Sequence, residues 1–480
     1  MTRKDELSPA PALTKGAEVD LDIDKLAFGG KALGRINGLV VFVAGALPGQ
    51  RLRVRLTRKK AHFAEAGVIE LLEQSPAYTP PRCRHFGLCG GCPWQNLAYE
   101  AQLHWKRQHV QECLEHLAGL RPEDIRPTCA SPEQFYYRNK MEFTFAPRPW
   151  LPAEELAAGK NPHEAGGALG LHAPGSFQRV FDLTECHLQS SQTGDLVTAV
   201  RDRVRASGLP VYDTRRHTGF WRFLVLREGK NTGQTLAHLI TTDQGDPKAV
   251  NALGAYLRER FPVITTLVHS VNAKKAQVAQ GQGERALWGP GFIEERLAGR
   301  RFRISAGSFF QTNTRAAEAL YDAVIRLAEL TGGETVWDLY CGAGSIALCL
   351  ADRARRVVGF ELLEAAIQDA YANSRLNGVD NCQFLAGDLK DCLREAITSS
   401  HHRPPDVVIT DPPRAGMHPQ VIKALLEIAP RRIIAVSCNP ATLARDLALL
   451  QERYDIAAVE PFDLFPHTAH IECVVRLERR

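Results

Sequence analysis

The chain has 480 residues, of which 44% are hydrophobic and 24% charged, as expected for a globular protein of two to four domains. No apolar run approaches the roughly 20 residues that cross a bilayer. Residues 1–16 also lack the apolar core of a signal peptide. We therefore expect a cytoplasmic protein without membrane contact. The net charge of +5 permits nucleic-acid binding without requiring it.

The N-terminal part predicts a tail and a small barrel. Residues 1–12 are rich in Pro, Ser and charge, which predicts a disordered tail. Residues 13–75 contain short apolar or alternating segments separated by Gly and Pro turns. The expected strands are Val19–Ile23, Leu39–Val43, Arg51–Leu56 and Gly67–Leu71. Such a series of short strands predicts an OB-like β-barrel.

A strongly basic segment lies within this barrel. It holds six positive charges and no negative one, at Arg51, Arg53, Arg55, Arg58, Lys59 and Lys60. Alternation along a strand places the first three arginines on one face. A solvated edge strand could carry such charges, but their number without local compensation favours an RNA-binding patch.

Residues 76–304 form an expected central domain with a cysteine-rich loop. Twelve cysteines without an export signal argue against a disulfide framework and favour metal or catalytic roles. Cys83, Cys89 and Cys92 are spaced as metal ligands, and Cys186 is the best candidate for a fourth. His85 and His187 are the alternatives to Cys186, although surface positions suit them better. The spacing does not separate zinc from an iron–sulfur cluster.

Two further features of the central domain follow from local composition. A helix is expected over Tyr99–Leu117, and it could pack on the catalytic domain. The stretch at 152–175 is rich in Gly, Ala and Pro, which predicts an exposed loop.

From residue 305 onward the pattern changes to an alternation of strands and helices. Helices are expected over Ala317–Leu330 and Glu364–Asn377. The expected strands are Thr335–Leu339, Arg356–Phe360, Gln383–Leu385, Val407–Thr410, Ile433–Val436 and Ile471–Leu477. This alternation predicts a doubly wound, mostly parallel α/β domain at 305–480.

A glycine-rich turn follows the first of these strands. Gly342 and Gly344 allow the backbone to approach a ligand just before a helix that begins near Ser345. The next two strands end in acids, Glu361 and Asp388, which suit a ribose and an adenine amino group. Ala347 also completes the G-x-G-x-x-A dinucleotide pattern, so NAD and S-adenosylmethionine both stay open at this point.

The later strands end in residues that carry reaction chemistry. Asp411 begins a rigid Asp-Pro-Pro loop, where it could orient a base edge. Cys438 follows a strand and precedes a helix start, a position that favours the thiolate. Glu472 stands in an apolar strand, where burial would raise its pKa toward that of a base. A thiolate that adds to carbon 6 of uracil, with a base that removes the carbon 5 proton, would allow methylation at carbon 5.

The segments YCGAGS, DPPRAG, SCNPATLARD and HIEC resemble those of the RNA 5-methyluridine methyltransferase family. The resemblance implies that Cys438 is the nucleophile and Glu472 the base, and that the cofactor is S-adenosylmethionine. It places cofactor contacts at Gln311, Tyr340, Gly342, Gly344, Ser345, Glu361, Asp388 and Asp411, although Ser345 stands where some members have Asn.

The N-terminal part, through Phe28-Gly29-Gly30-Lys31 and Leu47-Pro48-Gly49, resembles a TRAM domain. Ribosomal-RNA members of the family carry a 4Fe-4S cluster on similar cysteines, so the resemblance implies this cluster rather than zinc. It also implies 23S ribosomal RNA as the partner, with transfer RNA as the alternative, and a monomer. An NAD-type oxidoreductase would leave Cys438 without a role. A non-catalytic RNA-binding iron–sulfur protein would leave Cys438 and Glu472 unexplained.

Overall fold

The computed structural model describes residues 13–122, 124–162, 166–398 and 404–480. The tail expected at 1–12 lies outside the described residues. The chain divides into two compact units. The first comprises residues 1–82, 92–105 and 467–469, and the second comprises 83–91, 106–466 and 470–480. No helix among the described residues is long and apolar enough to cross a membrane.

The first unit contains a curved sheet that, within the described residues, has six strands in the order β1-β5-β6-β4-β3-β2. The strands are β1 (Glu18–Asp22), β2 (Lys25–Leu26), β3 (Ala32–Ile36), β4 (Leu39–Val43), β5 (Arg51–Lys59) and β6 (Phe63–Glu73). Asn37 and Gly38, both with positive φ, form the expected two-residue turn between β3 and β4. A Cβ at Gly34 would lie 2.0 Å from the carbonyl oxygen of Asp22, so a glycine is required where β3 approaches β1.

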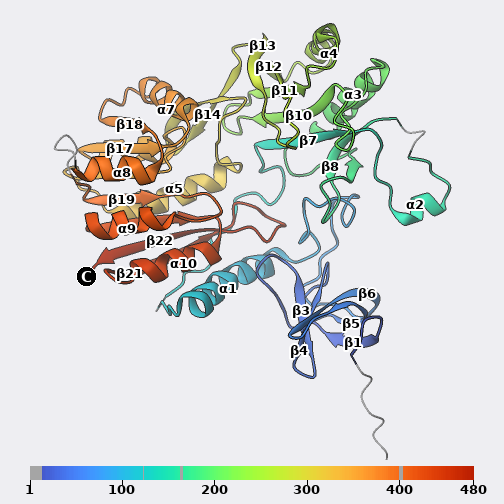
Figure 1. The fold of residues 1–480 in the computed structure, drawn as a ribbon, viewed down its shortest axis with the longest axis horizontal. Coiled ribbons are helices and arrows are strands. Elements are labelled where there is room, and N and C mark those ends of the chain that lie inside the picture. The colour runs from blue at the N-terminus through green and yellow to red at the C-terminus, as the bar shows by residue number, and fades with distance from the viewer. Residues whose placement is uncertain (1–12, 123, 163–165, 399–403) are drawn as a thin grey trace, which may run out of the picture. The chain divides into compact units, whose positions relative to one another are not determined.

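The second unit contains two large sheets (Figure 1). In the described residues the central sheet has the order β13-β12-β11-β10-β7-β8-β9. Its strands are β7 (Lys140–Ala146), β8 (Ala168–His172), β9 (Val180–Asp182), β10 (Trp221–Glu228), β11 (Thr235–Thr241), β12 (Ile264–Val271) and β13 (Gln282–Trp288). The accompanying helices are α2 (Ala153–Ala157), α3 (Thr193–Ala206) and α4 (Pro247–Arg260). A separate hairpin joins β14 (Phe292–Leu297) to β15 (Arg300–Ser305).

The expectation of an exposed loop at 152–175 is wrong in part. Helix α2 and strand β8 both lie in this range. Leu169 is fully buried because β8 pairs with β7 and β9 inside the central sheet. Single glycines and alanines in this stretch therefore suit a packed strand as well as a loop.

The C-terminal sheet has the order β18-β17-β16-β19-β20-β22-β21 in the described part of the chain. Strands β18 to β20 are parallel, and β22 is antiparallel to both of its neighbours. The strands are β16 (Thr335–Leu339), β17 (Arg356–Glu361), β18 (Cys382–Ala386), β19 (Val407–Thr410), β20 (Arg432–Ser437), β21 (Tyr454–Phe462) and β22 (Glu472–Arg479). The doubly wound, mostly parallel sheet is confirmed.

Helices cover both faces of this sheet. One apolar core joins it to α5 (Thr314–Ala328), α6 (Ser345–Leu350) and α7 (Glu364–Leu376). The core on the opposite face contains residues of α8 (Leu389–Thr398), α9 (Pro419–Ile428) and α10 (Pro440–Leu450). The second half of α1 (Tyr99–Ala118) joins that core through Val110 and Leu114, as expected for a helix that packs on the catalytic domain. A short 3-10 helix, Ala351–Arg353, follows α6.

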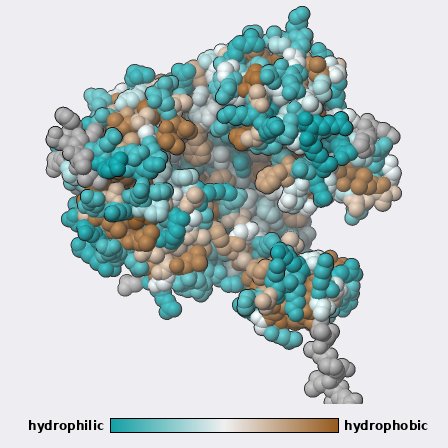
Figure 2. Space-filling view, viewed as in Figure 1, coloured by the Kyte–Doolittle hydropathy of each residue, from teal (hydrophilic) through white to brown (hydrophobic). Residues whose placement is uncertain are grey.

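Burial along the strands follows from the alternation of side chains. In β19, Val407 and Ile409 face one core and Val408 faces the other. Because both faces are covered, the strands are continuous apolar runs. Figure 2 shows hydrophilic side chains over much of the visible face, with apolar residues interspersed among them. Polar and charged side chains inside the C-terminal sheet are therefore informative, and they gather at the carboxyl ends of its strands.

Candidate active site at the carboxyl ends of the strands

The turn between β16 and α6 is built for close approach of a ligand. Tyr340, Gly342 and Gly344 all have positive φ, so the backbone reverses within a few residues. A Cβ at Gly344 would lie 3.0 Å from the ring of Phe384, which adds a packing reason for glycine at this position. The backbone N–H of Gly342 donates to a carboxylate oxygen of Glu361 at 3.1 Å. The turn is therefore fixed against the next strand.

The two predicted acids lie beside this turn. The carboxylate of Glu361, at the end of β17, also accepts from the backbone N–H of Leu363 at 3.0 Å. Asp388, after β18, is exposed, and its ion pair with Lys390 at 3.0 Å lowers its pKa. Leu362 and Leu363 are 65% and 63% exposed, which provides an apolar surface between the acids. Carboxylates beside an apolar surface fit the ribose and adenine of an adenosine cofactor.

Gln311 and Tyr340 complete the predicted set. Gln311 is buried, and its backbone carbonyl oxygen accepts a hydrogen bond from the side-chain amide of Asn139 at 2.7 Å. Asn139 also donates to Thr314 and, through its backbone N–H, to the carbonyl of Thr312. The central domain therefore holds the segment that carries Gln311. Burial raises the pKa of the Tyr340 hydroxyl to about 12, so this group is a hydrogen-bond donor at neutral pH.

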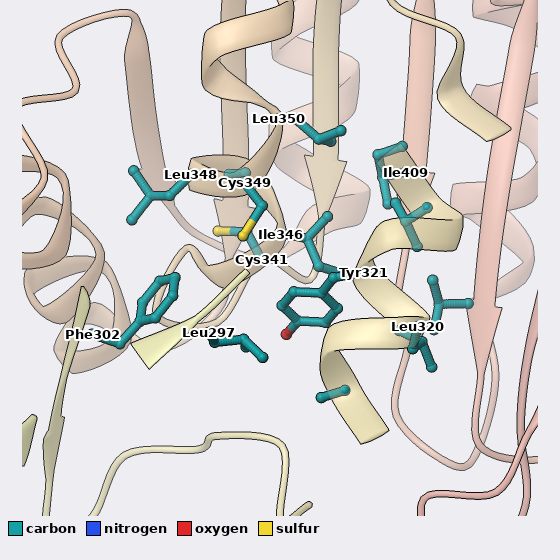
Figure 3. Close-up of a cluster of buried hydrophobic side chains, with 14 of the residues drawn as sticks. Leu297, Phe302, Leu320, Tyr321, Cys341, Ile346, Leu348, Cys349, Leu350 and Ile409 are labelled. Atoms are coloured by element: carbon teal, nitrogen blue, oxygen red, sulfur yellow. The ribbon is translucent and has the colours of Figure 1, made fainter. Parts of the chain in front are cut away.

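Ser345 has a partner that the sequence did not identify. The hydroxyl groups of Ser345 and Tyr321 lie 2.7 Å apart. Tyr321, on α5, lies in the buried cluster with Leu320 and Ile346 that Figure 3 shows, and burial raises its pKa well above the usual value. Its hydroxyl contacts the first residue of α6.

Asp338 is a second residue that sequence reasoning missed. It is buried in β16, and one of its carboxylate oxygens accepts from the backbone N–H of Ala347 at 3.0 Å. Burial, and then the charge of Asp411, raise its pKa to about 8. Burial alone raises the pKa of Asp411 to about 6. The signal that could have identified Asp338 is its position beside a second acid, Asp411. This signal can be used only when β16 and β19 are known to be neighbours in the sheet.

Cys438 lies between β20 and α10, as predicted, but its thiol is not activated. Burial raises its pKa to about 11, and Glu472 adds to this effect, whereas Arg414 opposes it. Helix α10 begins at Pro440, and Asn439 is its N-cap residue. The side chain of Asn439, and not the Cys438 thiol, therefore caps the N-terminus of this helix. The expectation that this position favours the thiolate is therefore wrong for the protein without substrate.

Glu472 is the buried acid expected from its apolar neighbours. It is 4% exposed at the start of β22, where Cys473 pairs with Ser437, the residue before Cys438. Burial raises its pKa well above the usual value, Asp411 adds to this effect and Arg414 opposes it. The charge of Glu472 contributes to the raised pKa of Cys438, so the two side chains lie within electrostatic reach of each other.

Arg414 connects these groups, although the sequence reasoning gave it no role. Its guanidinium donates to Nδ1 of His470 at 3.2 Å, and its positive charge lowers the pKa of both Cys438 and Glu472. Asn439 donates to the carbonyl of Arg414 at 3.0 Å, which ties the Asp-Pro-Pro loop to the start of α10. Burial, followed by the charge of Arg414, lowers the pKa of His470 to about 4, so its ring is neutral.

The predicted metal ligands Cys83, Cys89 and Cys92 lie in the cysteine-rich loop, and Cys186 lies in the segment after β9. No group of three or more His, Cys, Asp or Glu side chains in the described ranges is arranged to hold a metal ion. Burial is the main cause that raises the pKa of Cys89 to about 11, and Cys186 and Cys83 add to the rise. Cys92 belongs to the other compact unit.

The alternative ligands of this loop have other partners. Nε2 of His85 lies 2.9 Å from the hydroxyl of Thr184, and Nδ1 of His187 lies 2.9 Å from that of Tyr136. Both rings are thus engaged in hydrogen bonds with neighbouring hydroxyl groups.

The basic strand β5 has the predicted alternation, but its charges are compensated. Leu52, Val54 and Leu56 are buried and the arginines between them point outward. Arg53 pairs with Asp20 at 3.0 Å and with Glu70 at 3.2 Å, and Arg55 pairs with Glu18 at 2.6 Å. Arg51 and Arg58 have acidic partners at 3.9 Å. The prediction that the positive charges of this segment lack acidic partners is therefore wrong for these four arginines, because β1 and β6 supply the acids.

Comparison with known proteins agrees with this geometry. The profile of the tRNA (uracil-5-)-methyltransferase family matches residues 264–480, and that of the TRAM domain matches residues 12–69. An uncharacterized RNA methyltransferase of Nitratidesulfovibrio vulgaris is 44% identical, with 97% of each chain covered. One of Porphyromonas gingivalis is 43% identical over 96% of this chain and 99% of the relative. The chain belongs to the RNA uracil-5-methyltransferase family.

A solved structure supports the cofactor and the fold. The tRNA (uracil-54, C5)-methyltransferase of Pyrococcus abyssi, in complex with S-adenosyl-L-homocysteine, matches with a TM-score of 0.73 at 29% identity. The match covers 96% of this chain and 100% of that one. This methyltransferase therefore uses S-adenosylmethionine, and the NAD-type alternative is set aside. The carboxylates and exposed leucines at the β16–β18 edge are the residues that fit the adenosine part of the cofactor.

Proposed function

We propose that the enzyme methylates carbon 5 of a uridine in 23S ribosomal RNA, with Cys438 as nucleophile and Glu472 as base. The observation that carries this proposal is the placement of the two groups. The end of β20 and the start of β22 are paired, and they lie at the strand ends that also carry Asp411 and the cofactor turn.

The proposed reaction begins with the addition of the Cys438 sulfur to carbon 6 of the uracil. The bond formed there makes carbon 5 nucleophilic, and the cofactor supplies the methyl group that carbon 5 takes. Glu472 then accepts the proton from carbon 5. The carbon 6–sulfur bond breaks, the double bond between carbons 5 and 6 is restored, and Cys438 leaves as thiolate. The raised pKa of Glu472 suits this role, because it makes the carboxylate a stronger base.

Formation of the thiolate requires a change in its surroundings. At a pKa of about 11 the thiol is protonated near neutral pH. Arg414 is the cation that favours the thiolate, and it can act more strongly once the RNA displaces water from the site. The target base must also leave its stack to reach Cys438.

Transfer RNA is the second candidate substrate, because the Pyrococcus abyssi match is a tRNA enzyme and covers nearly the whole chain. The N-terminal domain therefore does not by itself favour ribosomal RNA, and the cysteine set is the remaining support. The test is to map 5-methyluridine in both RNA classes from a strain that lacks the gene. We expect loss of the modification from 23S ribosomal RNA alone, and loss from transfer RNA alone would contradict the proposed substrate.

We propose that the TRAM domain binds RNA mainly through Lys59, the last residue of β5, and Lys60, which follows it. Both are exposed, and no ion pair involving either is found among the described residues. Replacing both with Gln should weaken binding and lower the log–log salt dependence by roughly one unit per lost phosphate contact. Replacing Arg53 and Arg55 with Gln should have a smaller effect because carboxylates already neutralise them. A salt titration of RNA binding that gives the opposite order would show that the paired arginines are the contacts.

We propose that Cys83, Cys89, Cys92 and Cys186 hold a 4Fe-4S cluster, with zinc as the less favoured occupant. The support is the electrostatic effect of Cys83 and Cys186 on Cys89, that of Cys83 on Cys186, and the resemblance to ribosomal-RNA enzymes. Protein purified without air is expected to be brown and to contain about four iron and four sulfide per chain. Each cysteine replaced by Ser should reduce the iron content, and Cys113→Ser should not. Colourless protein with zinc alone would contradict the cluster assignment.

A further inference from the structure

Arg227 is a buried arginine that the reaction proposed above does not use. It lies near the end of β10, and only 2% of its surface is exposed. Its guanidinium donates two hydrogen bonds to backbone carbonyls just after β15: Nε donates to Ala306 at 3.2 Å, and Nη2 donates to Ser308. One side chain of the central sheet therefore holds the start of the segment that leads to Gln311. Residues 305–311 are called the cofactor segment below.

A guanidinium in this position needs a reason other than stability. Burial lowers the pKa of Arg227 to about 10, and the charges of Glu142, Glu284 and Asp369 oppose this effect. A buried charge often stabilises a fold no better than an apolar side chain of similar volume. What a buried guanidinium can add is a fixed arrangement of the groups that accept its hydrogen bonds. For Arg227 those groups are two carbonyl oxygens of the cofactor segment.

The other side of the cofactor segment is also held. Asp369, on α7, accepts hydrogen bonds from the hydroxyl groups of Ser308 and Ser305, the second at 3.4 Å. A Cβ at Gly307 would lie 2.9 Å from Oε1 of Glu284, on β13, so this carboxylate also lies close to the turn. The carbonyls face a cation on β10 and the hydroxyl groups face an acid on α7. A single backbone conformation of the segment satisfies both.

The end of β10 supports the far end of the cofactor segment as well. The backbone N–H of Glu228 donates to the carbonyl of Asn139 at 2.8 Å, and the side-chain amide of Asn139 donates to the backbone carbonyl of Gln311 at 2.7 Å. Arg227 and Glu228 are adjacent in the strand. The central sheet therefore fixes both ends of this segment, the first directly and the second through Asn139.

We propose that Arg227 is a positioning residue for S-adenosylmethionine, because it sets the backbone of the cofactor segment and thereby the place of the Gln311 side chain. The inference rests on the cofactor contact expected at Gln311. It goes beyond the function proposed above, since neither the class of RNA nor the role of Cys438 enters it. Cofactor affinity then depends on the central sheet, which lies outside the doubly wound domain.

The first test compares Arg227→Lys with Arg222→Lys. Arg222 is also on β10 and is 1% exposed, but its guanidinium donates to three carbonyls in the loop after β12. Lysine keeps the charge in both variants and lacks the fork of donors. Binding of S-adenosyl-L-homocysteine is measured by calorimetry without RNA. Arg227→Lys should weaken it by about tenfold, the effect of one weakened hydrogen bond at Gln311, and Arg222→Lys should bind as wild type.

Two further measurements separate a positioning role from a general loss of structure. Hydrogen exchange of the amides at 306–311, in protein without cofactor, should be faster in Arg227→Lys and unchanged in Arg222→Lys. Thermal melting checks that both variants are folded. Arg227→Met is the second variant if the lysine variant does not fold, because an apolar side chain of similar length can replace a buried charge. It should show the same loss of cofactor binding.

A double-mutant cycle with Gln311→Leu tests the route of the effect. Gln311→Leu alone should weaken binding by about tenfold. Because Arg227 acts through this side chain, the double variant should bind within about twofold of the Gln311→Leu single variant. Additive losses, or equal binding by Arg227→Lys and Arg222→Lys, would overturn the proposal. So would unchanged binding by Gln311→Leu. Wild-type protein that binds the cofactor but methylates no RNA would contradict the proposed function instead.

Discussion

Replacing Cys438 with Ala is expected to reduce methylation by about 10⁴-fold or more, because the variant lacks the thiol that is proposed to add to carbon 6 of the base. RNA with 5-fluorouridine at the target position should form a stable covalent complex with the wild-type protein, since fluorine is not removed as a proton is. The Cys438→Ala variant should form none. Denaturing electrophoresis of the RNA–protein complex measures this directly.

A matched control and a pH series sharpen this prediction. Cys392→Ala removes another partly exposed cysteine of the same domain, from α8, and should leave complex formation unchanged. With a thiol pKa of about 11, the rate of complex formation should rise about tenfold per pH unit between pH 7 and 9, because the thiolate fraction rises by that factor below the pKa. A rate independent of pH in this range would mean that the thiolate already exists in the RNA complex.

The Glu472→Gln variant is expected to retain RNA binding and complex formation but to lose turnover. The amide is nearly the same size as the carboxylate, yet it cannot accept the carbon 5 proton, so the methylated intermediate should accumulate with ordinary uridine. A loss of turnover of about 10²- to 10⁴-fold is expected for removal of a general base. Single-turnover kinetics, followed by denaturing electrophoresis, separate the two steps.

Glu427→Gln is the control for this variant, because Glu427 is exposed on α9 and outside the site. It should behave as wild type. If Glu472→Gln turns over normally, another group removes the proton, and Asp411, whose pKa is raised to about 6, would be the first residue to examine. If the variant forms no complex, Glu472 is needed earlier, for example to accept the proton of the Cys438 thiol.

Most strands of the catalytic sheet could be predicted from the sequence because their signals are local. Strands β16 and β19 have the predicted bounds, and each is followed directly by a residue of the site, Tyr340 and Asp411. Strand β21 was missed: along Tyr454–Phe462 buried and exposed residues mix and a proline interrupts the run, so no clear apolar period marks it. It pairs only with β22 in the sheet order, which is a tertiary relation.

Contacts between distant segments account for the errors in the site. Arg53 and Asp20 become partners only through the register of β5 on β1, which the charge of the segment does not reveal. The bond between Tyr321 and Ser345 likewise joins α5 to the start of α6. The pKa of Cys438 depends on burial, and this outweighs the effect expected from its position before a helix. Residue types and strand ends were thus predictable, whereas protonation and pairing were not.

The most direct test of the proposed mechanism is mass spectrometry of the peptide that remains attached to RNA. The wild-type protein is incubated with S-adenosylmethionine and RNA containing 5-fluorouridine, and the complex is digested with protease and nuclease. If the proposed mechanism is correct, we expect one modified peptide, in which Cys438 is joined to a base that carries both the fluorine and a new methyl group. A methylated base attached to any other residue, or methylated RNA with no attached peptide at any time, would contradict it.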